Sequence, residues 1–240
     1  MNILVTGGSS GLGKAIVEKL AKDIRNTVYF TYNKHADTSE LIAGLYSNVH
    51  SKQCDFSDKG SIENLLSSLG DWDLDVLIHN AYVGKAEGVH FHKQNVTEFQ
   101  NSFEINVLPV ILITQKALET FRKKKSGKIV TILTGYLFNQ PPTGYSLYAS
   151  NKAYLWQLSK SWSKEYIRYG ITSNCISPDF METELTRDTD ERVVDRMRSE
   201  HPLKRLLTTD EVANCVRFLV DASSQINGVN IPVNAGKNIL

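Results

Sequence analysis

The sequence predicts an α/β fold in which a doubly wound parallel sheet of about seven strands carries helices on both faces. Short apolar segments alternate with amphipathic segments along the whole chain, and the connections between them are short. In addition, a glycine-rich run from Thr6 to Gly13 directly follows the first apolar segment and opens the first amphipathic one. Together these observations indicate repeated strand-helix-strand units, which build a parallel sheet.

Strands are predicted where apolar, β-branched and aromatic residues gather, at residues 3–6, 27–32, 49–55, 75–80, 128–133, 171–176 and 229–233. Helices are predicted from apolar positions at helical spacing, at residues 14–22, 39–45, 61–69, 97–122, 148–169 and 209–220. Pro109 predicts a kink in the longest helix, because a proline removes one helical hydrogen bond. No repeat, linker or low-complexity segment interrupts the pattern, so residues 1–240 are expected to form one domain.

Charge and composition argue against several classes of function. The formal net charge of the 240-residue chain is +1, so no overall field favours nucleic acid or an anionic membrane. The three cysteines are far apart and show no CxxC spacing, which fits reduced thiols better than disulfides or a metal site. The first residues run directly into a strand, and no apolar run approaches the roughly 20 residues of a membrane span. A cytoplasmic protein without a signal peptide is expected.

The glycine run has the composition of a phosphate-binding loop. Gly7, Gly11 and Gly13 lie between a strand and a helix, where backbone amides and the helix N-terminus can hold a pyrophosphate. The alternative is that these are ordinary turn glycines. The position of the loop favours a dinucleotide site, and with it a sheet of the Rossmann type.

A second informative segment is the run Tyr148-Ala-Ser-Asn151-Lys152. On a helix, residues four apart lie on one face, so a phenol and an ammonium are about one turn apart. A nearby positive charge favours the phenolate, and we therefore expect Lys152 to lower the pKa of Tyr148 from its usual value of about 10. A proton donor and a dinucleotide site on one chain suggest hydride transfer to or from a carbonyl.

These segments resemble the short-chain dehydrogenase/reductase family of the single-domain type, whose fingerprint is TGxxxGxG. The likeness runs nearly end to end and includes Asn80-Ala81, Asn106, the Tyr148/Lys152 pair and Ser177-Pro178. The helix that starts near Asp210 and the tail at residues 227–233 most resemble the 3-oxoacyl-carrier-protein reductases. The resemblance implies an NADP- or NAD-dependent oxidoreductase.

In that family the tyrosine is the general acid in reduction, the lysine lowers its pKa and holds the nicotinamide ribose, and an asparagine positions a relay water. These roles would fall to Tyr148, Lys152 and Asn106, with a structural hydrogen bond as the alternative for Asn106. The family serine that binds the substrate carbonyl aligns with Thr134, one position further from the tyrosine than usual. Threonine has the same hydroxyl capacity, but its branched side chain has fewer rotamers.

The end of the second strand favours NADP(H) over NAD(H). NAD-selective relatives usually place a carboxylate there, whereas this chain has Asn33 and Lys34, which can donate to a 2′-phosphate. Weak selection, with a solvated Lys34, is the alternative. The residues expected at the cofactor are Gly7, Ser9, Ser10, Gly11, Leu12, Gly13, Tyr32, Asn33, Lys34, Asp55, Phe56, Asn80, Ala81, Tyr148, Lys152, Pro178 and Thr183.

The substrate pocket is expected to be aromatic, with Tyr136, Tyr145, Phe180 and Met181 around the catalytic strand ends. Such a pocket suits either an acyl thioester or a sugar ring, and the sequence does not separate the two. Two residues near this pocket differ from the family motifs. Tyr82 replaces the glycine of Asn-Ala-Gly, and Asp179 replaces the glycine of Pro-Gly. They raise a third possibility, a dinucleotide-binding regulator without turnover. The apolar helix at residues 148–169 predicts a homo-oligomer. The charged, irregular region at residues 179–199 fits either a mobile lid or a plain surface helix.

Overall fold

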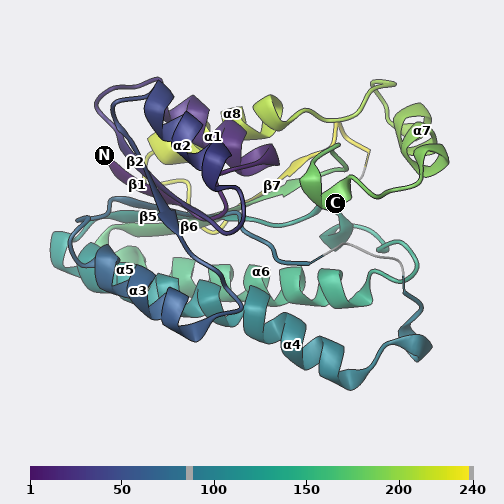
Figure 1. The fold of residues 1–240 in the computed structure, drawn as a ribbon, viewed down its shortest axis with the longest axis horizontal. Helices are drawn as coiled ribbons and strands as arrows, with labels where there is room; N and C mark the ends of the chain where they lie inside the picture. Colours follow the sequence, from purple (N-terminus) through teal and green to yellow (C-terminus); the bar gives the residue numbers. More distant parts are fainter. Residues whose placement is uncertain (85–88, 238–240) are drawn as a thin grey trace.

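The computed structural model describes residues 1–84 and 89–237, and its strands form one parallel sheet (Figure 1). The order across the sheet is β3-β2-β1-β4-β5-β6-β7. The strands are β1 (Asn2–Val5), β2 (Thr27–Tyr32), β3 (Val49–Gln53), β4 (Val76–His79), β5 (Gly127–Ile132), β6 (Ile171–Pro178) and β7 (Asn230–Val233). The chain builds outward from β1 to β3, then returns to β4 on the other side of β1. The predicted fold class is confirmed, and the reversal between β1 and β4 is the place where such sheets bind ligands.

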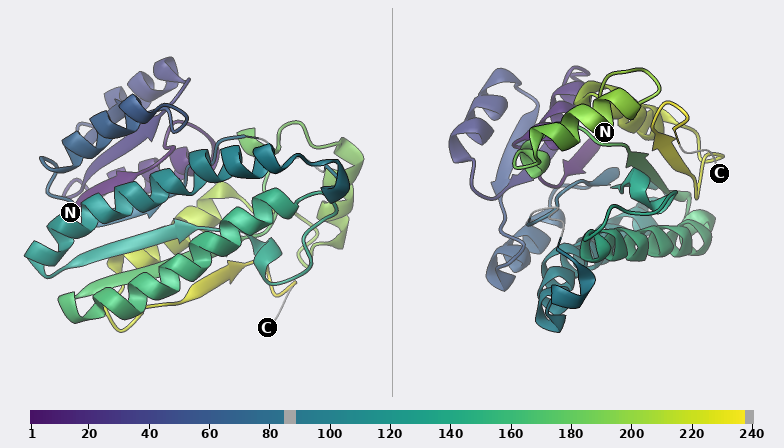
Figure 2. Two further views of the ribbon diagram at one scale, coloured as in Figure 1. Left: turned by 90° about the horizontal axis from the view of Figure 1, so that it is seen from below. Right: turned by 90° about the vertical axis from the view of Figure 1, so that its right-hand side faces the viewer.

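Helices cover both faces of the sheet. They are α1 (Gly11–Ala21), α2 (Ala36–Leu45), α3 (Lys59–Leu69), α4 (Val96–Asn106), α5 (Leu108–Lys124), α6 (Ser146–Tyr166), α7 (Glu191–Glu200) and α8 (Thr209–Asp221). In Figure 1, α1, α2 and α8 lie above the sheet, and α3, α4, α5 and α6 lie below it. Figure 2 shows the lower face, where α5 and α6 run side by side. Short 3-10 turns are at Phe91–Lys93, Gly135–Leu137, Ile167–Tyr169 and Glu184–Thr186.

The sheet is buried between two apolar layers. On the α1/α8 side, Ile16 and Val216 are fully buried against the strands, and on the α3/α5 side Leu65 and Phe121 are. A third cluster joins α5 and α6 to the sheet through Val110, Leu155 and Cys175. Because both faces are covered, the central strands β1 and β4 are nearly continuous apolar runs rather than alternating ones, and β6 is buried along its whole length although it contains polar residues.

Most predicted elements are present, with two instructive differences. The long helix is divided at Val107, so that Pro109 lies in the first turn of α5, where its missing N–H costs nothing. The region predicted as irregular and charged contains α7, in which Val194 is the one buried residue. α7 agrees with the alternative of a surface helix, because charged residues dominate its sequence and only Val194 is buried.

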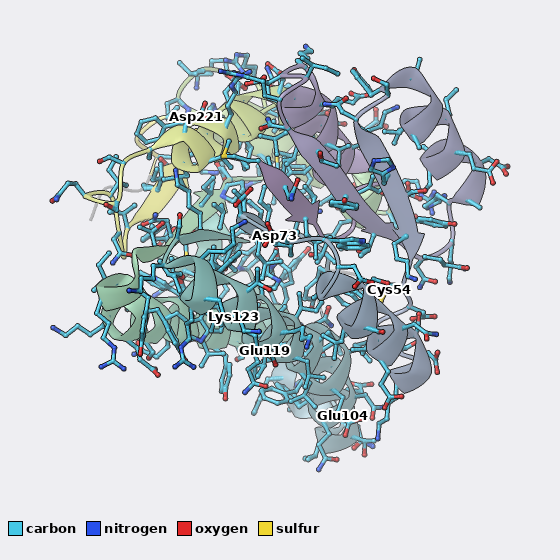
Figure 3. The ribbon with its side chains drawn as sticks, turned by 90° about the vertical axis from the view of Figure 1, so that its left-hand side faces the viewer. Cys54, Asp73, Glu104, Glu119, Lys123 and Asp221 are labelled. Carbon is cyan, nitrogen blue, oxygen red and sulfur yellow. The ribbon has the colours of Figure 1, made fainter. Side chains whose placement is uncertain are left out.

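The amino end of the sheet is closed by charged groups. Lys124 Nζ lies 3.2 Å from Asp73 Oδ2 and 2.5 Å from Asp75 Oδ1, and Asp75 Oδ2 accepts a 2.8 Å hydrogen bond from the backbone N–H of Asn2. Figure 3 looks onto this end, with Asp73 labelled near its middle. The carboxyl end of the sheet is left for a site. Within the described ranges, none of the helices combines the length and apolar character that crossing a bilayer requires.

Candidate active site

A cavity of about 480 Å³ opens at the carboxyl ends of the strands. It is lined by nearly all the side chains that the sequence singled out. These are Gly7, Ser9, Ser10, Gly11, Leu12, Gly13, Tyr32, Asn33, Lys34, Phe56, Asn80, Ala81, Thr134, Tyr136, Tyr145, Tyr148, Lys152, Pro178, Phe180, Met181 and Thr183. Asp55 and Asn106 are the two predicted site residues that do not line it. The cavity therefore joins the glycine loop to the Tyr148/Lys152 pair.

The glycine loop has a shape that side chains would prevent. Gly7 and Gly11 adopt φ values of +68° and +48°, in the left-handed region. A Cβ on Gly13 would lie 1.9 Å from the carbonyl oxygen of Gly7. The first turn of α1 can therefore pack directly on the loop, and its free backbone N–H groups face the cavity, as a pyrophosphate requires.

Asn80 braces this loop from the neighbouring strand. Its Nδ2 donates to the carbonyl oxygens of Thr6 at 3.1 Å and Gly7 at 3.0 Å. The hydroxyl of Thr6 in turn accepts from the backbone N–H groups of Asn80 at 3.0 Å and Ala81 at 3.1 Å. Asn80 thus holds the loop in shape, in addition to lining the cavity.

Tyr148 and Lys152 meet at the other end of the cavity. Lys152 is 4% exposed, and its Nζ donates a 2.8 Å hydrogen bond to the carbonyl oxygen of Ile132. The Nζ lies 5.8 Å from the centroid of the Tyr148 ring. The predicted pair therefore shares one face of α6, as the helical spacing requires.

The pKa values of this pair differ from the expectation. Burial raises the pKa of Tyr148, the nearby tyrosines raise it further, and hydrogen bonding to Thr134 offsets only part of the effect. Burial lowers the pKa of Lys152 to about 8. The prediction that the ammonium brings the phenol below its usual pKa is wrong for the site as the structure presents it, because loss of hydration outweighs the charge.

Thr134 is placed where the family serine is expected. It is 6% exposed and caps the 3-10 turn after β5, where its Oγ1 accepts a 3.4 Å hydrogen bond from the backbone N–H of Tyr136. Its hydroxyl also interacts with the phenol of Tyr148 and lowers the pKa of that phenol. The extra residue in the following loop has therefore not moved the hydroxyl away from the tyrosine.

Asn106 lies outside the cavity, with its amide fully engaged. Its Oδ1 accepts from the backbone N–H of Val83 at 2.7 Å, and its Nδ2 donates to the carbonyl of Val83 at 3.0 Å. These bonds fix the loop that follows β4. These bonds agree with the structural alternative for Asn106, and its role in holding a relay water stays a prediction.

Asp55 also serves a local purpose. Its Oδ1 accepts from the backbone N–H and the hydroxyl of Ser57, at 2.8 and 2.7 Å, and these bonds lower its pKa. Asn33 donates to the same carboxylate, whereas Lys34 is exposed on the cavity wall. These bonds are those of a loop cap beside the cavity, and the contact of Asp55 with a cofactor stays a prediction. The charge of Lys34 also helps to lower the pKa of Asp55.

The residues predicted for the substrate pocket line the cavity, and aromatic rings predominate among them. The rings of Tyr136 and Tyr145 are 5.6 Å apart at 73°, an edge-to-face pair. Asp179 also lines the cavity, and its Oδ2 lies 3.1 Å from Nζ of Lys237 in the C-terminal segment. Tyr82 lines the cavity as well, in contact with Tyr148. Its signal in the sequence was the departure from Asn-Ala-Gly, which gave no indication of the contacts that the ring makes.

The donor set of the site fits a dinucleotide and offers nothing for a metal. In the described part of the chain, no group of three His, Cys, Asp or Glu side chains is placed to hold a metal ion. The glycine cradle, the open N-terminus of α1 and the adjacent Lys34 together fit a phosphorylated ligand.

Comparison with known proteins decides the family. A family model described as enoyl-(acyl carrier protein) reductase matches residues 7–238. The chain belongs to the short-chain dehydrogenase/reductase family. It is therefore an oxidoreductase of that family.

Two relatives and one structure illustrate the likeness. The 3-oxoacyl-[acyl-carrier-protein] reductase FabG of Buchnera aphidicola is 33% identical over 239 residues, covering 97% of this chain and 95% of that protein. The corresponding reductase MabA of Mycobacterium avium is 30% identical over 240 residues, covering 98% and 89%. A short-chain dehydrogenase of Burkholderia cenocepacia, solved in complex with NADP, superposes with a TM-score of 0.86 at 26% identity, covering 99% of this chain and 97% of the other.

Proposed function

We propose that this short-chain dehydrogenase/reductase is an NADP(H)-dependent carbonyl reductase that acts on a 3-oxoacyl thioester. The observation that carries the proposal is the single cavity that connects the glycine loop to Tyr148, Lys152 and Thr134. The thioester is supported by the names of the two relatives, both 3-oxoacyl-carrier-protein reductases. NADP(H) is supported by Lys34 at the end of β2 and by the NADP in the Burkholderia structure.

NADPH, when bound, supplies the hydride that adds to the substrate carbonyl carbon. Its phosphates would be held by the amides of residues 7–13, and a 2′-phosphate by Lys34. Thr134 donates a hydrogen bond to the carbonyl oxygen and polarises the C=O bond. Tyr148 then gives its proton to that oxygen as negative charge develops there, which yields the alcohol.

Tyr148 is in the protonation state that reduction requires, although its raised pKa makes the phenol a weaker acid. The phenol stays protonated at neutral pH, so it is ready to act as an acid. Lys152 is held against the Ile132 carbonyl and presents a positive charge near the phenolate that forms after proton transfer. The charge therefore stabilises the product side of the step more than the starting phenol.

Initial rates with NADPH and NADH test the proposal. Acetoacetyl thioester, a nucleotide-linked keto-sugar and a crotonyl thioester are compared, the last because the family model is described by an enoyl reductase. We expect NADPH-dependent turnover of the acetoacetyl thioester, and a loss of about 10²- to 10⁴-fold in Tyr148→Phe with NADPH binding unchanged. Faster turnover of the keto-sugar or the enoyl thioester would contradict the proposed 3-oxoacyl thioester and favour that other substrate. Tight NADPH binding without turnover of any substrate would favour the regulator.

We also propose that the protein forms a homo-oligomer through α4, α5 and α6. Leu108, Leu112 and Tyr154 are 39%, 41% and 45% exposed on these helices, which lie on one face of the sheet. Leu155, Trp156, Leu158 and Trp162 of α6 pack instead against the core of the same chain. Light scattering at micromolar concentration tests this, and a monomeric mass would contradict it.

A further inference from the structure

Tyr82 stands where the family has the glycine of Asn-Ala-Gly, and its ring contacts both members of the catalytic pair. It meets Tyr148 edge to face, with centroids 4.9 Å apart and an interplanar angle of 78°. The Nζ of Lys152 lies 5.4 Å from the centroid of the same Tyr82 ring. An ammonium within about 6 Å of a ring face is attracted by the negative charge density there. One side chain thus touches the proposed acid and the group that supports it.

The hydroxyl of Tyr82 is anchored in a buried polar cluster. It interacts with the side chains of Ser102 on α4 and Asn151 on α6, and these bonds offset part of the raising effect of burial on the pKa of Tyr82. Asn151 Nδ2 itself donates to Ser102 Oγ at 2.8 Å. Both anchors are more than nine-tenths buried. The ring cannot turn away from Lys152 without breaking this cluster.

The backbone next to Tyr82 is also fixed. Asn106 bonds both the N–H and the C=O of Val83, at 2.7 and 3.0 Å, and its Nδ2 lies 3.5 Å from Ser102 Oγ. The asparagine that the sequence assigned to catalysis therefore supports the segment that carries Tyr82. The backbone of this segment is thus held by α4, and the Tyr82 side chain by α4 and α6.

The groups around Lys152 allow the Tyr82 ring to contribute to the stability of its ammonium. Among the described residues, no Asp or Glu carboxylate pairs with its ammonium. The titratable groups that face it are Tyr148 on its own helix, Cys175 from β6 and His79 from β4, together with Tyr82. Two rings face this ammonium, Tyr82 at 5.4 Å and Tyr148 at 5.8 Å, and the nearer Tyr82 ring acts together with the Ile132 carbonyl to favour the charged form of the buried lysine.

We propose that Tyr82 is a positioning residue for the reduction, which holds Tyr148 edge-on and keeps the ammonium of Lys152 charged against the Ile132 carbonyl. The proposal rests on the proposed function for its kinetic consequence. If the ring stabilises the ammonium, its removal lowers the pKa of Lys152, and turnover then fails at a lower pH on the basic side.

Two substitutions separate the ring from its hydroxyl. Tyr82→Phe keeps the ring and loses the anchor, and we expect kcat to fall about threefold with the pH profile unchanged. Tyr82→Leu keeps an apolar side chain and loses the ring, and we expect kcat to fall about tenfold with KM and NADPH affinity within twofold. The basic limb of its profile moves down by about one pH unit. Tyr169→Leu, which removes a ring that the guanidinium of Arg122 contacts and that does not line the cavity, is the matched control and leaves both unchanged.

A measurement without turnover keeps the two proposals apart. The titration of Lys152 is followed by NMR of 13Cε-labelled lysine, assigned with Lys152→Arg, in the wild type and in Tyr82→Leu. A lower midpoint in Tyr82→Leu supports the positioning role, even if the wild type turns over no substrate and the proposed function fails. An unmoved midpoint, or a Tyr82→Leu profile that matches the wild type, overturns it.

Discussion

Backbone atoms form the wall at one end of the cavity, and side chains form it at the other. At the β1/α1 end the wall is backbone, and its shape depends on glycines that nothing larger can replace, such as Gly13 against the Gly7 carbonyl. At the β5/α6 end the wall is side chain, and Tyr148, Lys152 and Thr134 depend on neighbours from several distant segments. A backbone site is specified by local sterics, whereas a side-chain site is specified by burial and contacts. This chain follows its family at the first end and departs from it at the second, with Thr134, Tyr82 and Asp179.

The largest effect is expected from a substitution at the β1/α1 end, where the backbone forms the cavity wall. In Gly13→Ala, the new Cβ would stand 1.9 Å from the Gly7 carbonyl oxygen, so the loop or the first turn of α1 must move. We expect NADPH affinity to fall more than 100-fold and the melting temperature to drop, by calorimetry and fluorescence titration. Gly44→Ala in α2 is the control, because nothing lies within 4 Å of its added Cβ and alanine favours the helix. Wild-type NADPH affinity in Gly13→Ala would contradict the backbone site.

A substitution at the β5/α6 end, where side chains form the cavity wall, should lower kcat without changing NADPH affinity. Thr134→Val removes the hydroxyl at nearly constant volume, and we expect kcat for the thioester to fall on the order of 10²-fold, with NADPH affinity unchanged. Thr134→Ser, which restores the family residue, should stay within threefold of the wild type. Equal kcat values for the valine and serine variants would show that the Thr134 hydroxyl does not polarise the substrate carbonyl.

Buried titratable groups should make the side-chain end sensitive to acid. Burial, aided by the charge of Lys152, lowers the pKa of His79 to about 3. The unfolded chain therefore binds a proton below about pH 6.5 that the folded chain rejects, and stability is lost as the pH falls. Between pH 7 and 5 the free energy of unfolding should drop by about 2 kcal/mol through this group. Urea denaturation should show that drop reduced in His79→Gln and retained in the exposed control His50→Gln.

The smallest effect is expected at Lys34, on the exposed rim of the backbone end. Lys34→Ala should weaken NADPH about tenfold and leave NADH unchanged, because one screened charge-assisted contact to a 2′-phosphate is lost. Lys59→Ala, an exposed lysine away from the cavity, controls for net charge. Parallel losses for both dinucleotides in Lys34→Ala would show that Lys34 does not select the phosphate.

The sequence predicted the architecture and most of the cavity wall. Alternation of apolar and amphipathic segments is a local signal, and it predicted the seven strands and all helices except α7, which was left as one of two alternatives because charged residues dominate that segment. The motif spacing also brought Thr134 to Tyr148 despite the extra loop residue. The partners of Asp55 and Asn106, which are Ser57 and Val83, could not be predicted because an isolated polar residue in a sequence does not reveal its partner. Their roles toward a cofactor and a relay water stay predictions.

By itself, then, the sequence determined a doubly wound parallel sheet, a glycine loop at its switch point, and a tyrosine and a lysine on one face of a helix. Periodicity and steric exclusion act over a few residues, so they can be read along the chain. Only the tertiary structure decided that the pKa of Tyr148 is raised and that Lys152 is buried against a carbonyl. It also decided that Tyr82 is held by residues of α4 and α6 and contacts both Tyr148 and Lys152. The reason is that a pKa and a hydrogen-bond partner depend on the loss of water and on groups far away in the chain, which meet only when the molecule has folded.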